Sequence, residues 1–147
     1  IMEHFKELIG KKVIKFPSNK PFKSGFKTNT VKGIITHEIT GRPAFLFEED
    51  DSYVEIRGCI PVDIKVDFSK VENLYPGCRV IKVVEFYVTG TGWLNRWDNH
   101  NKISSKYSVE DQIKRCWSEG AIKVMLRIEH EGQTKEPDYS MNELVTY

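Results

Sequence analysis

Four consecutive acids, Glu48 to Asp51, form the densest group of potential metal ligands in the sequence. Mg²⁺ and Ca²⁺ need several oxygen ligands that converge on one point. Neighbouring residues of an extended chain point to alternate faces, and the run lacks the D-x-D-x-D-G spacing of a calcium loop. The pattern therefore favours a solvent-exposed hairpin turn, and we predict neither a metal site nor a cofactor.

Asp98 and His100 lie two residues apart and could share a proton or a metal ion. A hydrolytic centre needs a third partner, for which the sequence offers no candidate. The chain also lacks the G-x-S-x-G, H-E-x-x-H and cysteine–histidine signatures. The sequence therefore predicts a protein without catalytic activity. A small metal-dependent hydrolase around Asp98 and His100 is the weakest alternative.

One loop interleaves lysines with phenylalanines, as some binding surfaces do. Its candidate contact residues are Lys20, Phe22, Lys23, Phe26 and Lys27. Aromatic side chains can stack on bases while lysines neutralise phosphates. The same phenylalanines could instead fill the mouth of a barrel while the lysines stay in water.

Trp93 and Trp97 form the second candidate binding segment. They lie four residues apart in a polar, glycine-marked stretch. If buried, they belong to a core, whereas an exposed tryptophan is a typical anchor of a protein interface. The sequence leaves both interpretations open.

The elements that would position these residues begin with five short apolar runs separated by turn formers. These runs span residues 11–16, 31–39, 44–48, 53–60 and 61–68. Five strands with this spacing suit a small SH3-like or OB-like barrel, because two-stranded pieces of this size would be marginal in water. We therefore expect residues 1–68 to form a small β-barrel module.

The rest of the chain mixes strand and helix patterns. Residues 69–77 resemble a connector, and a strong strand run follows them. Ser108 is placed to cap a helix whose apolar stripe is formed by Val109, Ile113, Cys116 and Trp117. We expect residues 69–147 to form a sheet with one packed helix, so the fold class is predicted to be α+β, mainly β.

Charge and cysteine content limit the function classes. The net charge is +1, but residues 1–36 carry eight lysines and two glutamates, whereas residues 37–73 carry four bases and nine acids. A nearly neutral whole argues against a strongly electrostatic nucleic-acid binder. Three cysteines without a C-x-x-C pair, and no apolar run near the roughly 20 residues that span a bilayer, predict a cytoplasmic protein with reduced thiols.

The segment from Lys20 to Val54 resembles a recurrent segment of small tailed-phage accessory proteins of unknown function. The matching stretches are Lys20–Gly25, Asn29–Gly33, Thr40–Phe45, Glu48–Ser52 and Val54. Nothing after Ile60 takes part, and Glu55-Ile56 stands where the resemblance leads us to expect a cysteine. The resemblance implies phage origin and action in the cytoplasm of an infected bacterium. It transfers no activity and no catalytic residue.

The expected function is that of a phage-encoded accessory protein that binds and modulates a host protein, such as a defence or transcription component. The alternative is a module that binds nucleic acid or a nucleotide. In that case Lys20, Lys23 and Lys27 would contact phosphate, while Phe22, Phe26 or Trp93 would stack on bases. The sequence leaves the partner's identity and the oligomeric state open.

Overall fold

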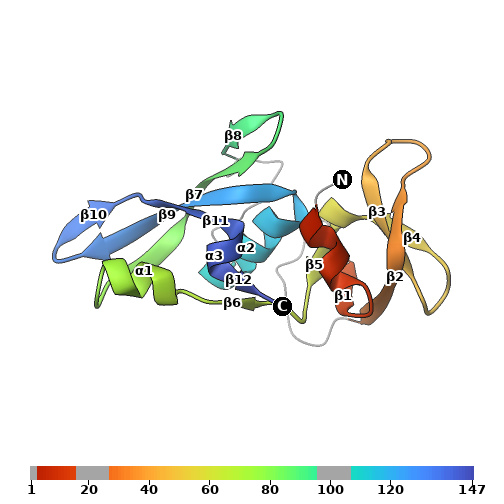
Figure 1. Cartoon of the computed structure of the whole chain (residues 1–147), viewed down its shortest axis with the longest axis horizontal. Coiled ribbons are helices and arrows are strands. Elements are labelled where there is room, and N and C mark those ends of the chain that lie inside the picture. Colours follow the sequence, from red (N-terminus) through yellow and green to blue (C-terminus); the bar gives the residue numbers. More distant parts are fainter. Residues whose placement is uncertain (1–2, 16–26, 96–106) are drawn as a thin grey trace. The chain divides into compact units, whose positions relative to one another are not determined.

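The computed structural model describes residues 3–15, 27–95 and 107–147, and Figure 1 traces these residues as ribbon. The chain divides into two compact units, residues 1–64 together with Tyr147, and residues 65–146. The described residues contain 12 strands and one helix longer than six residues. The predicted class, α+β and mainly β, is confirmed.

The first unit is built around one antiparallel sheet with the strand order β4-β3-β2-β1-β5 (Figure 1). Strand β5 returns to pair with β1, so that the sheet curls into a half-barrel of the SH3-like order. The elements are η1 (Glu3–Leu8), β1 (Lys12–Lys15), β2 (Thr28–Thr36), β3 (Pro43–Phe47), β4 (Tyr53–Glu55), η2 (Ile56–Gly58) and β5 (Cys59–Pro61).

Alternating apolar residues build the core of this unit. Val13, Val31, Phe45 and Phe47 are fully buried within the sheet. Phe5 of η1 contacts Phe45 edge to face, with 6.4 Å between the ring centroids. A strand exposes one face to each side, so apolar residues on one face collect against each other and exclude water.

Three of the predicted strand boundaries in the first half are wrong. The run 53–60 is not one strand, because the 3₁₀ turn η2 separates β4 from β5. The run 61–68 is not one strand either, because it holds the last residue of β5 and then the two-residue strand β6 (Lys65–Val66). The run 31–39 corresponds to β2, which ends at Thr36 and leaves Ile39 in the following turn.

The second unit is centred on the long antiparallel pair β7 (Arg79–Val88) and β9 (Ala121–His130). Its main sheet has the order β10-β9-β7-β8, and β11 also pairs with β9. The remaining elements are α1 (Ser69–Leu74), β8 (Gly92–Leu94), α2 (Val109–Ser118), β10 (Gln133–Lys135), β11 (Asp138–Ser140), α3 (Met141–Leu144) and β12 (Val145–Thr146), which pairs with β6. The connector expected at residues 69–77 is instead the short helix α1.

Helix α2 forms where its sequence predicts it. The Ser108 hydroxyl accepts a hydrogen bond from the backbone N–H of Asp111 over 3.2 Å, which caps the first turn. Ile113, Cys116 and Trp117 of the predicted stripe are fully buried, and α2 packs on β7 and β9. The packing of α2 covers one face of the sheet. The opposite face carries Trp93, Tyr87 and Lys123.

Candidate functional site

Most of the predicted contact residues lie outside the described part of the chain. Lys20, Phe22, Lys23, Phe26 and Trp97 belong to residues 16–26 and 96–106, as do Asp98 and His100 of the hydrolase alternative. Lys27 and Trp93 are the two predicted contacts that the structure describes.

Lys27 lies beside the acidic turn. Hydrogen bonds from Ser52 lower the pKa of Asp50, and the charges of Lys15 and Lys27 lower it further. Lys32 forms an ion pair with Asp51, with 3.1 Å between Nζ and Oδ1. The lysine-rich and acid-rich parts of the sequence are therefore neighbours in the folded unit, and the charge of Lys27 acts on the Asp50 carboxylate.

The acidic run forms the exposed turn between β3 and β4, and its side chains are engaged locally. Both carboxylate oxygens of Glu49 accept the backbone N–H of Thr30, at 2.8 and 2.9 Å. Asp50 accepts from the backbone N–H of Ser52 at 3.0 Å. In the described ranges no group of three or more His, Cys, Asp or Glu side chains is arranged to hold a metal ion.

The three cysteines are free thiols in the folded chain. Cys59 and Cys116 are fully buried, and burial raises the pKa of Cys116 strongly. Burial and the nearby Glu72 charge raise the pKa of Cys78. Because the thiolate is the reactive form, none of the three has the environment of a nucleophile.

Trp93 lies on the sheet face opposite α2, in a row across three strands. Tyr87 of β7 is the register partner of both Trp93 on β8 and Lys123 on β9. The Trp93 and Tyr87 rings meet edge to face with centroids 5.5 Å apart, and the Lys123 ammonium lies 5.7 Å from the Tyr87 ring centroid. We call these three residues the Trp93 patch.

The Trp93 patch combines an exposed indole with fixed geometry. The Trp93 side chain is 40% exposed, which is unusual for a large aromatic residue. Edge-to-face packing contributes about 0.5–1.5 kcal/mol beyond area burial, so Tyr87 restrains the indole before any partner binds.

Charged residues continue from the Trp93 patch along the same sheet face. Glu85 and Asp138 flank Met125 in the next row of this face. Further along, Arg79 pairs with Glu129 at 2.8 Å, and Arg127 pairs with Glu136 at 3.0 Å. The face therefore carries an aromatic row at the β8 edge and both signs of charge along the rest of β7 and β9.

A second exposed apolar feature lies in the first unit, in the turn between β2 and β3. Ile39 at this turn is 89% exposed, the largest exposure among the large apolar side chains described as exposed. The backbone N–H of His37 donates to the Arg42 carbonyl at 2.8 Å, and that of Gly41 donates to the His37 carbonyl at 2.9 Å. We call residues 37–42 the Ile39 turn.

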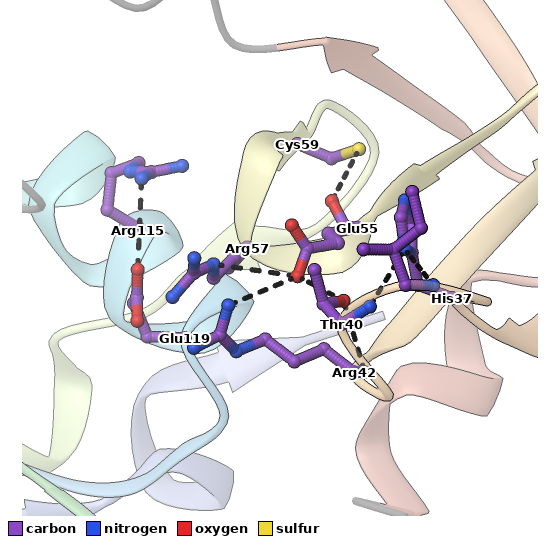
Figure 2. A network of polar contacts seen from close by, with 9 residues as sticks. His37, Thr40, Arg42, Glu55, Arg57, Cys59, Arg115 and Glu119 are labelled. Atoms are coloured by element: carbon purple, nitrogen blue, oxygen red, sulfur yellow. Dashed lines mark hydrogen bonds and ion pairs between the residues drawn. The ribbon is translucent and has the colours of Figure 1, made fainter.

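Glu55 of β4 ties the Ile39 turn to the sheet, as Figure 2 shows. Its carboxylate accepts the Thr40 hydroxyl at 3.0 Å, and the Arg42 and Arg57 guanidiniums lie 3.6 and 3.8 Å away. Partial burial acts to raise the pKa of Glu55, but Thr40 and the two arginines outweigh it and lower the pKa. This network was not predicted from the sequence, because residues 40–43 indicated only a turn.

No protein-family model, curated protein or solved structure matches this chain. In the described ranges, no helix has both the length and the apolar character needed to span a membrane.

Proposed function

We propose that this chain is a non-catalytic binding protein that recognises a partner protein through the Trp93 patch. The observation that carries the proposal is an indole that is both exposed and held in place by a cross-strand aromatic neighbour. Tryptophan is enriched among the residues that dominate binding energy at protein interfaces. A restrained side chain also loses less conformational freedom when it is buried by a partner.

The charges around the patch favour a protein partner over nucleic acid. Glu85, Glu129, Glu136 and Asp138 lie on the same sheet face as Trp93. Glu129 and Glu136 are paired with Arg79 and Arg127, so the face has no excess of positive charge to attract a phosphate backbone. Polar residues of mixed charge next to an aromatic anchor are usual for protein interfaces.

The resemblance of residues 20–54 to tailed-phage accessory proteins supports a bacterial partner, such as a defence or transcription component. On this proposal the protein acts in the cytoplasm of the host. It modulates its partner by occupying a surface, without a chemical step of its own.

Pull-down with the full chain from bacterial lysate tests the proposal, followed by affinity measurement with the purified retained protein. Trp93→Ala is expected to weaken binding by roughly 30-fold or more, as hot-spot tryptophans do. Leu74→Ala is the matched control, because Leu74 of the same unit is an exposed apolar residue outside the patch, at 68% exposure. Equal binding by wild type and Trp93→Ala would exclude this patch as the contact surface.

One observation favours nucleic acid as a second candidate. Lys123 has no acidic ion-pair partner among the described residues, and its ammonium lies 5.7 Å from the centroid of the Tyr87 ring, which in turn contacts the exposed indole. Titration with single-stranded oligo(dT) at several salt concentrations tests this candidate. Phosphate contacts would make the affinity fall steeply with salt, and Lys123→Met would reduce that slope.

A further inference from the structure

The Ile39 turn presents an isolated apolar side chain to solvent. The Ile39 side chain is 89% exposed, and on its flank the Tyr53 ring packs edge to face against His37 with centroids 5.4 Å apart. A single exposed aliphatic residue needs no explanation in itself. Ile39 differs from such a residue because several hydrogen bonds fix the conformation of the turn that carries it.

The turn is held from both sides of Ile39. Nδ1 of His37 accepts the backbone N–H groups of Ile39 at 3.2 Å and of Thr40 at 3.3 Å. The Thr40 hydroxyl accepts from the Arg42 backbone N–H at 3.3 Å and donates to Glu55 at 3.0 Å. Preorganisation of this kind lowers the entropy cost of binding at the tip.

The charge next to Ile39 restricts the chemistry of an occupant. Glu38 is exposed, and its carboxylate has no ion pair or hydrogen bond among the described residues. The cation of the same turn, Arg42, is paired with Glu55 at 3.6 Å, which leaves Glu38 as the unpaired charge beside Ile39. An unpaired anionic neighbour opposes insertion of Ile39 between DNA bases or into an anionic lipid surface. It complements a basic residue at the rim of a protein pocket.

We propose that the Ile39 turn is a contact element for a protein partner whose surface has an apolar pocket bordered by a lysine or arginine. Ile39 fills the pocket, Glu38 pairs with the basic rim, and His37 is the positioning residue that fixes the turn. The turn belongs to the first unit, whereas the Trp93 patch belongs to the second.

A diazirine-bearing aliphatic amino acid close in size to isoleucine, placed at position 39 of the full chain and irradiated in bacterial lysate, identifies the contacting molecule. The captured protein is then purified, and its affinity is measured for wild type and variants. Ile39→Ala is expected to weaken binding by about tenfold or more. Glu38→Lys is expected to weaken binding at low salt and to do so less at high salt.

Ile9→Ala is the matched control, because Ile9 of the same unit is also exposed, at 48%, and lies outside the turn. It is expected to leave the affinity unchanged. His37→Ala is expected to weaken binding and to reduce the protection of the Ile39 and Thr40 amides from hydrogen exchange. The proposal is overturned if the cross-linked species is nucleic acid or a second copy of this chain. It also fails if nothing is captured, or if the captured protein binds Ile39→Ala as tightly as wild type.

Discussion

The backbone N–H of Ile39 donates a hydrogen bond to Nδ1 of His37 over 3.2 Å, and the N–H of Thr40 donates to the same nitrogen. One imidazole nitrogen therefore serves as the acceptor for two successive residues of a turn. An imidazole with protons on both nitrogens has no acceptor, so these bonds require a proton-free Nδ1.

His37→Ala is expected to destabilise the first unit by about 1 kcal/mol, because two backbone donors lose their protein acceptor and turn to water. Urea denaturation measures the loss, and amide hydrogen exchange locates it at Ile39 and Thr40. Ile39→Ala should keep both bonds, since the donors belong to the backbone. Unchanged amide protection in His37→Ala would show that the imidazole does not hold the turn.

Gln112 of α2 connects the helix to the sheet from a buried position, with 3% of its surface exposed. Its Oε1 accepts the Val83 backbone N–H at 2.8 Å, and its Nε2 donates to the Tyr107 carbonyl at 3.0 Å. Gln112→Leu leaves both backbone groups without these partners, so we expect a loss of about 2 kcal/mol or more. Thermal and urea unfolding measure it, and Gln133→Leu on the exposed strand β10 is the control, expected to change stability little.

Acid should destabilise the first unit through its β3–β4 turn. The Thr30 backbone N–H lowers the pKa of Glu49, and Ser52 lowers the pKa of Asp50. A carboxyl with a depressed folded-state pKa stabilises the fold once it is ionised, so this contribution is present above about pH 4.3 and is lost as the pH falls through the lowered pKa values. Urea midpoints between neutral and acid pH test this. Glu49→Gln should flatten the pH dependence, and Glu48→Gln should not.

Alkali should affect the second unit through Tyr139, which is 5% exposed. Burial and the neighbouring Tyr75 raise the pKa of Tyr139 to about 12. A raised pKa means that the fold favours the neutral phenol, so this contribution is complete below about pH 10 and is lost as the pH rises towards the folded-state value. Burial also raises the pKa of Tyr107, so tyrosinate absorbance should show late ionisation that Tyr139→Phe reduces without removing.

The same substitution tests a feature of the packing. The Tyr139 hydroxyl is buried and has no hydrogen-bond partner among the described residues. Removing such a group costs no hydrogen bond, so Tyr139→Phe should leave stability unchanged or raise it by up to about 1 kcal/mol. A clear loss of stability would mean that the hydroxyl has a partner after all.

Sequence patterns predicted the elements that are stabilised by residues close together in the sequence. Helix α2 was predictable because Ser108 and the stripe through Ile113 and Trp117 carry both a cap and an apolar face. Helix α1 was missed because it has six residues and its N-cap, Phe68, makes no side-chain capping bond. Without such a cap, a short helix depends on tertiary packing, which leaves little trace in sequence.

The candidate surfaces depend on features that are not local. Trp93 was singled out from its residue type, but its neighbours Tyr87 and Lys123 follow from strand register. Ile39 was assigned to a strand because it continues an apolar run, and only the turn geometry after Thr36 exposes it. Whether an apolar residue is exposed depends on the tertiary fold, so composition and periodicity could not predict the exposure of Ile39.

The return of β5 to β1 also bears on how the first unit forms during translation. Val13 on β1 pairs with Asn29 on one side and with Pro61 on the other. Until the ribosome has synthesised residue 58, β2 is available to pair with β1, but β5 does not yet exist. One edge of β1 therefore stays unpaired until Pro61 has left the ribosomal exit tunnel. During that interval the nascent chain is most prone to aggregate, and a chaperone would protect it most.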